Sequence, residues 1–133
     1  MKTHELNTKI KLAALWTSLM ILYIYADIFS LYRPGHLGHI EEGLMGPLQA
    51  NQTNLAVAGL LMAIPALMIA FSVIFKAKTS KIVNILVSIL YILVNIGNLI
   101  GETWVYYIFY GVLEIAINMY IVYIAFKWKE AEM

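Results

Sequence analysis

The sequence predicts an all-α integral membrane protein, folded as an antiparallel bundle of four helices. Of its 133 residues, 62% are hydrophobic and 13% are charged, whereas soluble domains average about 45–50% apolar and about 25% charged residues. A chain this short has too little interior to bury that many apolar side chains away from water. Four separate runs of roughly 20 mostly apolar residues are each long enough to cross a bilayer as a helix.

The four predicted spans belong to one membrane domain that covers the whole chain. They are residues 12–32, 54–75, 82–101 and 104–126 of a domain covering 1–133. The first span contains one acid, Asp27, and the fourth contains one acid, Glu114. The second and third contain no charged residue.

The connections between spans carry the expected breaking residues. Residues 33–35 (Arg-Pro-Gly) end the first span, because proline lacks the backbone N–H and glycine permits a turn. Ser80 is the expected N-cap of the third span. Residues 102–103 leave a joint so short that the third and fourth spans must be antiparallel neighbours. The loop 33–53 is the one long connection, and we expect it to hold a short interfacial helix or a re-entrant turn.

The basic residues predict the orientation in the membrane. With four spans, eight lysines fall on one side and only Arg33 falls on the other. Short loops rich in Lys and Arg stay in the cytoplasm, so both termini should be cytoplasmic and the loop 33–53 should face outward. The lysines are Lys2, Lys9, Lys11, Lys76, Lys78, Lys81, Lys127 and Lys129. The partner this implies is the lipid bilayer, since a net charge of +1 gives no support for a nucleic acid.

Two spans carry informative seams at helical spacing. Small and polar faces of membrane helices turn toward other helices. The second span has a smooth seam at Ala56, Gly59, Ala63, Ala66 and Ala70. The third has a polar stripe at Asn84, Ser88, Tyr91, Asn95, Asn98 and Glu102. The smooth seam predicts close helix packing. The polar stripe either lines a hydrated cavity or pairs with polar residues on the first and fourth spans.

Glu114 is the leading functional candidate because it lies near the middle of the fourth span. A charged acid there costs at least about 3 kcal/mol, so the side chain should face the interior and find a partner. The other spans offer no lysine or arginine, so we expect a neutral carboxyl hydrogen-bonded to Asn118, Asn95 or Tyr23. Such an acid carries protons, anchors a ligand or only locks the bundle together.

Asp27, Arg33 and Glu102 should lie near the outer end of the bundle. One interpretation is a simple ion pair of Arg33 with either acid. The other is an acidic mouth that attracts a cationic amphiphile to aromatic rings on the same seams. Those rings are Trp16, Tyr23, Tyr91 and Tyr107.

The candidate ligand-binding residues lie on the first, third and fourth spans and at the outer joint. They are Tyr23, Asp27, Tyr91, Asn95, Asn98, Glu102, Tyr107, Glu114 and Asn118. We expect no metal and no cofactor, although His36, His39 and Glu42 could share a helical face. No catalytic residue is assigned, since no nucleophile elbow, phosphate loop or zinc-protease motif occurs. Enzyme activity is therefore unsupported.

Two stretches of the sequence are distinctive: ALWTSLMILYIYADIFSLYRPG at 14–35 and AGLLMAIPALMIAFSVIFK at 58–76. They resemble a family of small bacterial inner-membrane proteins of unknown function. This resemblance implies four spans in the inner membrane. In architecture the chain also resembles the more distant DoxX-like proteins and related sterol-binding four-helix proteins, which implies a pocket inside the bundle. Small multidrug exporters have similar size and one membrane glutamate, but theirs lies in the first span, whereas Glu114 lies in the last.

Three functional hypotheses follow. The first is a protein that binds or carries a small amphiphilic or lipid-like molecule in a polar pocket inside the bundle. The second is a structural or accessory subunit without a ligand, with the 56–70 seam facing lipid to dock a partner or form a homodimer. The third is a dimeric proton-coupled exporter, which requires Glu114 to be reachable from both sides in turn.

Overall fold

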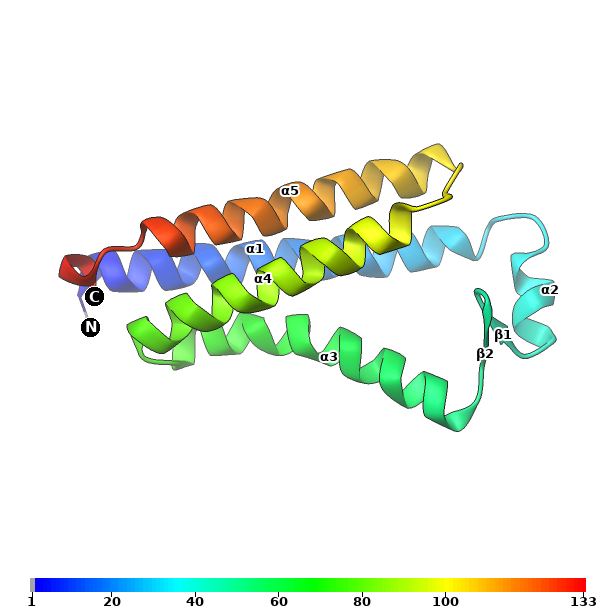
Figure 1. The fold of residues 1–133 in the computed structure, drawn as a ribbon, viewed down its shortest axis with the longest axis horizontal. Coiled ribbons are helices and arrows are strands. Elements are labelled where there is room, and N and C mark those ends of the chain that lie inside the picture. The colour runs from blue at the N-terminus through cyan, green and yellow to red at the C-terminus, as the bar shows by residue number, and fades with distance from the viewer. Residues whose placement is uncertain (1) are drawn as a thin grey trace.

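The computed structural model describes residues 2–133 and contains four long antiparallel helices (Figure 1). They are α1 (Thr3–Ser30), α3 (Gln52–Ile74), α4 (Ala77–Leu99) and α5 (Val105–Lys127). Each is long and apolar enough to cross a membrane. The expected all-α, four-helix architecture is therefore confirmed. A short 3-10 turn, η1 (Glu130–Glu132), ends the chain.

The two ends of the bundle differ in character. At one end, the "termini end", both chain termini meet the α3–α4 connection (Figure 1). At the other, the "loop end", the chain between α1 and α3 forms α2 (His36–Glu41) and a hairpin of two short strands, β1 (Leu44–Met45) and β2 (Leu48–Gln49). The expected short helix in this loop is α2. The hairpin turns at Gly46, whose φ of 61° suits glycine.

The helices do not all pack with equal closeness. Helix α4 packs most extensively against α5, and α1 packs against both α3 and α5, whereas α3 and α4 share only a short contact. The Tyr91 hydroxyl of α4 donates a hydrogen bond to the Leu61 carbonyl of α3. Toward the loop end from that bond, α3 diverges from the other helices (Figure 1). The bundle is therefore closed at the termini end and splayed at the loop end.

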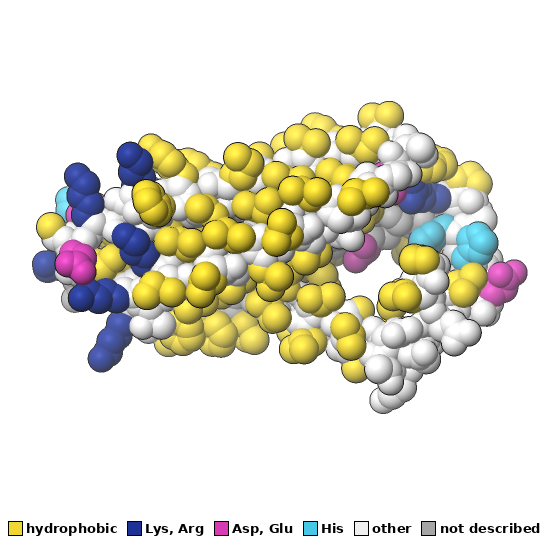
Figure 2. Space-filling view, in the orientation of Figure 1, with side chains coloured by type: hydrophobic (Ala, Val, Ile, Leu, Met, Phe, Trp, Pro, Cys, Tyr) yellow, Lys and Arg dark blue, Asp and Glu magenta, His cyan; other side chains and the backbone are white. Residues whose placement is uncertain are grey.

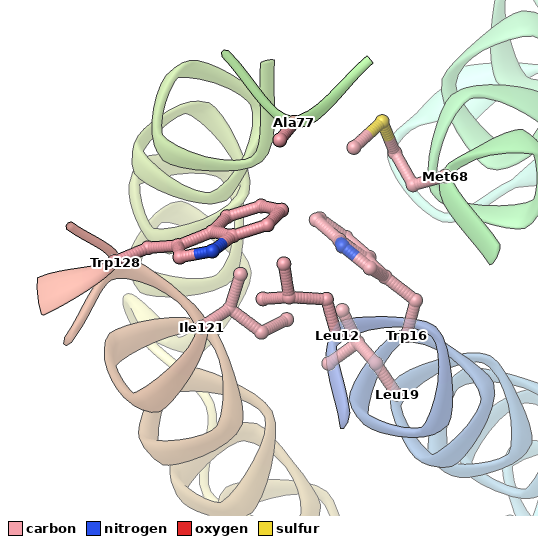
Figure 3. Packing of buried hydrophobic residues seen from close by; sticks show 7 residues of the cluster. All are labelled: Leu12, Trp16, Leu19, Met68, Ala77, Ile121 and Trp128. Atoms are coloured by element: carbon pink, nitrogen blue, oxygen red, sulfur yellow. The ribbon is translucent and has the colours of Figure 1, made fainter. Parts of the chain in front are cut away.

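The apolar core occupies the closed half. Seven buried side chains from all four long helices and the C-terminal segment meet there (Figure 3): Leu12, Trp16, Leu19, Met68, Ala77, Ile121 and Trp128. Trp128 follows α5 and turns its ring into this cluster (Figure 3). The Lys81 ammonium donates to the Trp128 carbonyl at 2.7 Å, which satisfies a carbonyl beyond the last turn of α5.

The smooth seam of α3 does not face the bundle, contrary to the expectation of close packing. Most of its members are exposed: Ala56, Gly59, Ala66 and Ala70. The buried face of α3 instead carries Pro65, Met68 and Ser72. Ser72 donates to the Asn84 side chain of α4, and a buried hydroxyl that needs a partner orients a helix more strongly than small size does.

The start of α4 also differs from the expectation. The helix begins at Ala77, so Ser80 lies inside the first turn and is not the N-cap. Its hydroxyl donates to the Ser72 carbonyl at 2.9 Å. This bond ties α4 to α3 across their connection, so the serine serves helix packing.

Candidate functional site

The polar stripe of α4 faces the interior over four of its predicted positions. Asn84, Ser88, Tyr91 and Asn95 are at most 2% exposed. Asn98 continues the same face but is exposed, because it lies where α3 has diverged. The stripe therefore passes from the closed half of the bundle into the splayed half.

In the closed half Asn84 itself is fully paired, whereas the buried hydroxyl of Ser88, one turn further along the stripe, has no partner. The Trp16 indole N–H of α1 donates to the Asn84 side-chain oxygen at 2.7 Å, and the Ser72 hydroxyl donates to the same atom at 3.2 Å. The Asn84 amide donates in turn to the Ser80 carbonyl at 2.8 Å. The partners of Asn84 come from α1 and α3, whereas the sequence predicted partners from the first and fourth spans. This network has no free capacity for a ligand.

In the splayed half, Tyr23, Asn95, Glu114 and Asn118 come together from α1, α4 and α5. The Tyr23 hydroxyl donates to the Asn95 side-chain oxygen at 3.1 Å and lies within interaction range of Glu114 and Asn118. Glu114 is 7% exposed, so the interior position expected for it is confirmed. The Asn118 amide donates to the backbone carbonyl of Glu114 at 3.2 Å and not to its carboxyl group.

The Glu114 carboxyl makes no hydrogen bond to any group in residues 2–133. The expected bonds to Asn118, Asn95 or Tyr23 are therefore absent from this arrangement. The Tyr23 hydroxyl is directed at the Asn95 side-chain oxygen and the Asn118 amide at the Glu114 backbone carbonyl, while the Asn95 amide has no partner. Glu114 is thus a buried acid with its hydrogen-bonding capacity free.

Buried polar atoms without a hydrogen-bond partner recur around this acid. In residues 2–133 such atoms belong to Arg33 (Nε), Ser88 (Oγ), Asn95 (Nδ2), Asn118 (Oδ1) and Trp128 (Nε1). Leaving a buried polar group unpaired costs about 1–3 kcal/mol. Two of these residues, Asn95 and Asn118, lie with Tyr23 beside Glu114. The site thus contains one unpaired donor, one unpaired acceptor and a carboxyl without a partner. A polar molecule bound there would supply the missing hydrogen bonds.

Asp27 lies one turn beyond Tyr23 on α1 and is exposed. Its charge is close enough to interact with Glu114 and with the half-buried Tyr107 of α5, and also with His36 of α2. Since Glu114 and Tyr107 point between the helices, we conclude that Asp27 faces the opening left by α3. Figure 2 shows the molecule hollowed there, with an acidic side chain at the rim.

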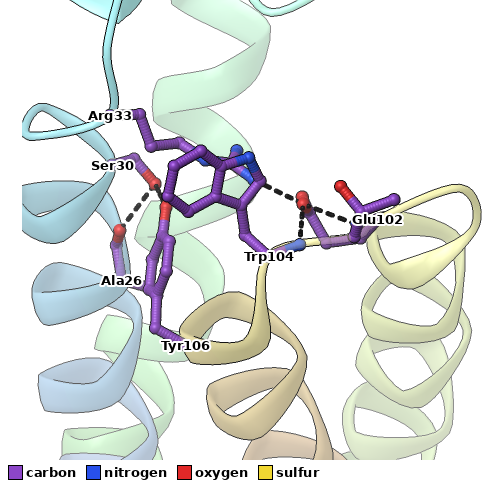
Figure 4. A network of polar contacts seen from close by, with 7 residues as sticks. Ala26, Ser30, Arg33, Glu102, Trp104 and Tyr106 are labelled. Atoms are coloured by element: carbon purple, nitrogen blue, oxygen red, sulfur yellow. Dashed lines mark hydrogen bonds and ion pairs between the residues drawn. The ribbon is translucent and has the colours of Figure 1, made fainter.

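Glu102 is occupied by a different set of contacts (Figure 4). Its carboxylate forms an ion pair with Arg33 and accepts the backbone N–H groups of Thr103 and Trp104 at 3.0 Å. Burial raises the pKa of Glu102, but these hydrogen bonds and the Arg33 charge outweigh burial and hold the pKa below its ordinary value. The ion-pair interpretation is confirmed for Glu102, and Asp27 takes no part in it.

The surroundings of Arg33 contain an aromatic cavity that the sequence did not predict. The guanidinium carbon lies 4.9 Å from the ring centre of Trp104 and 5.5 Å from that of Tyr106. The Tyr106 hydroxyl is 2.8 Å from the Ser30 hydroxyl, which joins α1 to α5 (Figure 4). A cavity of about 350 Å³ lies between these residues and Phe29. Aromatic residues at both helix ends were the available signal, because such residues gather at membrane interfaces.

A family model described as a family of unknown function (DUF6326) matches residues 1–133. The chain belongs to this family. No curated protein and no solved structure matches it. Membership of DUF6326 confirms the expected uncharacterised family of proteins. Because the family has no assigned activity, the function of this DUF6326 chain must be argued from its own site.

Proposed function

We propose that this protein is a multi-pass inner-membrane protein that binds a small amphiphilic, lipid-like molecule in the opening between α3 and the other long helices. Both termini lie in the cytoplasm, and the loop end faces outward. The observation that carries the proposal is the buried Glu114 carboxyl, which lacks a hydrogen-bond partner and lies beside unpaired atoms of Asn95 and Asn118.

The energetic argument concerns the polar atoms that remain unpaired. In a bilayer no bulk water can satisfy them, so each raises the free energy of the empty protein. A ligand whose head group donates to Glu114 and Asn118 removes that cost on binding, and the gain favours the bound state. Glu114 is the anchor in this arrangement.

The nine candidate residues have different places in the proposed site. Tyr23, Asn95, Glu114 and Asn118 form its polar floor. Tyr91 closes the site toward the termini end through its bond to α3. Asp27, Asn98 and Tyr107 line the opening, and Glu102 lies at its mouth, held by Arg33.

The splayed arrangement of α3 suits an amphiphile. Along the half of α3 that lies toward the loop end, most side chains are exposed, including Leu55, Leu60 and Leu61. An apolar tail lying beside them would leave the polar floor free for the head group. The opening would also let a molecule enter sideways from the bilayer.

Native mass spectrometry of the gently solubilised protein tests this proposal. We expect a bound molecule that is enriched over bulk membrane lipid. It should be lost in Glu114→Leu and Asn118→Leu, which replace the polar floor by apolar side chains. Glu130→Leu, at the exposed termini end, is the matched control and should keep the molecule. Circular dichroism and size-exclusion chromatography confirm that each variant is folded. Bulk lipid alone in the wild-type protein would refute the proposal.

A second candidate function is favoured by the exposed seam of α3. Small residues that face lipid permit close approach of another helix, so a homodimer or an accessory role through Gly59 and Ala66 is the alternative. The chain has no cysteine, so Gly59→Cys gives a single thiol for disulfide cross-linking. Rapid cross-linking of Gly59→Cys but not of Ile74→Cys, which is exposed at the other end of α3, would support a dimer. A proton-coupled exporter would need a second opening at the termini end, where the apolar core closes the bundle (Figure 3).

A further inference from the structure

We infer that the ligand carries a positive charge: an organic cation with an apolar tail, such as a long-chain ammonium, held between Asp27 and Glu114. This inference rests on the proposed function and names the chemical class of its ligand. The carrying observation is that two acids from different helices approach the same opening without a lysine or arginine between them.

The two acids converge by helix geometry. The hydroxyl contact between Ser30 and Tyr106 places those residues at about one level. Asp27 lies three residues before Ser30, and Glu114 lies eight after Tyr106. At 1.5 Å per residue, about 8 Å therefore separates the acids along the bundle axis.

Side-chain direction shortens that separation. Helical side chains lean toward the N-terminus of their helix. The N-terminus of α1 lies at the termini end, and that of α5 lies at the loop end (Figure 1). Asp27 therefore leans toward Glu114, and Glu114 leans toward Asp27, in agreement with the interaction between their charges. An ammonium head group fits between them as the shared counter-ion.

The basic residues in 2–133 are committed elsewhere. Arg33 is paired with Glu102. The lysines gather at the termini end, the far side of the bundle from Asp27 (Figure 2). The base whose charge reaches Asp27 is His36 of α2, at the mouth of the opening. Glu114 has no such neighbour, and an isolated acid at this depth is costly unless a cation or a proton joins it.

The hydrogen-bonding capacity of the site points in the same direction. Free acceptors are the Glu114 carboxyl and the Asn118 side-chain oxygen, which is fully buried. The one free donor beside them is the Asn95 amide. A site with more acceptors than donors selects a ligand that brings protons or positive charge. Tyr23 and Tyr107 add aromatic rings near the acids, and such rings attract cations.

The test compares two amphiphiles of nearly the same shape on the full-length protein in zwitterionic nanodiscs. The probes are dodecylammonium, whose head group donates N–H groups, and dodecanol, its uncharged counterpart of nearly the same shape, which serves as the isostere. Binding is measured by calorimetry, with empty nanodiscs subtracted. We expect the cation to bind at least about tenfold more tightly than the isostere, the factor expected from about 1.4 kcal/mol of charge interaction.

The variants separate charge recognition from binding in general. Glu114→Gln and Asp27→Asn keep shape and polarity but remove charge, and each should weaken binding of the cation about tenfold and weaken binding of the isostere much less. Glu130→Gln, which removes an acid at the termini end, should leave both affinities unchanged.

Three outcomes overturn the inference. If both probes bind equally and the variants change neither, the cation preference is wrong while the proposed amphiphile site stands. Preference for dodecyl sulfate over both would also refute it. If neither probe binds above empty nanodiscs, the cation inference falls, and co-purified molecules in the mass spectrum then decide whether the proposed function falls too.

Discussion

The hydrogen bond between Trp16 and Asn84 gives a direct stability prediction. Asn84→Leu keeps the branching and the number of side-chain heavy atoms but removes the acceptor of the buried Trp16 indole N–H and of the Ser72 hydroxyl. Interhelical hydrogen bonds in membranes contribute on average about 0.6 and at most about 1.7 kcal/mol, while an unpaired buried donor costs about 1–3 kcal/mol. The Ser72 hydroxyl keeps a partner in the variant, because it also donates to the Met68 carbonyl of its own helix. The unpaired Trp16 indole N–H therefore accounts for most of the expected loss of stability. We expect Asn84→Leu to lower the free energy of unfolding by about 1–3 kcal/mol.

A double-mutant cycle isolates the bond itself. Trp16→Phe, Asn84→Leu and the double variant are unfolded reversibly in mixed micelles, followed by helical circular dichroism. The expected coupling energy is about 0.5–1.7 kcal/mol, the range for one buried interhelical bond. Asn98→Leu, an exposed asparagine on the same helix, is the control and should change stability little. A coupling energy below about 0.3 kcal/mol would refute the assignment of stability to this bond.

Two further predictions concern the loop end of the bundle. A Cβ at Gly111 would lie 2.5 Å from a methyl carbon of Leu99 and 2.9 Å from its branch carbon; Gly111→Ala should therefore destabilise the α4–α5 pair by about 1–3 kcal/mol. Gly97→Ala, which meets open space, should stabilise by up to about 1 kcal/mol in the same unfolding assay, because alanine favours the helix, and equal effects at both sites would contradict the packing argument. The lowered pKa of Glu102 means that its contribution to stability is complete above its unfolded value of about 4.5 and is lost as the pH falls through the folded value. In Glu102→Gln the free energy of unfolding should therefore fall less as the pH is lowered below about 4.5, and Arg33→Gln should show part of the same effect. If the pH dependence of Glu102→Gln equals that of the wild type, other acids cause the loss of stability.

The sequence predicted the long helices well because length and apolar content alone identify a helix able to span a bilayer. It placed the start of the first span at residue 12, whereas α1 begins at Thr3. The added turns are polar but stable, since Lys9 is buried and pairs with Glu5 at 3.1 Å. Hydropathy cannot detect such turns, because their stability comes from side-chain pairing within the helix.

The buried face was predicted correctly for α4 but not for α3. For α4 the polar stripe identified the buried face because polar groups in an otherwise apolar helix must find partners. For α3 the seam of small residues was misleading, since small residues tolerate both close packing and lipid. The single hydroxyl of Ser72 settled the rotation of α3. A polar residue is thus a stronger guide to helix orientation than a run of small ones.

The depth of Glu114 predicted its burial, but sequence could not predict its lack of a partner. Asn118 lies one helical turn away and could reach either the carboxyl or the carbonyl of Glu114. In the structure the Asn118 amide donates to the backbone carbonyl of Glu114. That choice depends on side-chain rotamers set by neighbouring helices, which spacing along one chain does not encode.

The contrast between the two halves of the bundle links stability to the proposed site. Around Asn84 the polar atoms of α1, α3 and α4 satisfy one another, and the apolar core packs over them. Around Glu114, Asn95 of the same stripe and Asn118 of α5 each have an unpaired atom. Unpaired groups persist in a folded protein only where other interactions offset their cost. We therefore expect the two halves to respond separately: Asn84→Leu should lower stability with little effect on bound amphiphile. Glu114→Leu should abolish binding while leaving the ligand-free protein as stable as wild type or more so. If Glu114→Leu instead destabilised the ligand-free protein as much as Asn84→Leu does, the acid would belong to the structural framework and the site would lose its basis.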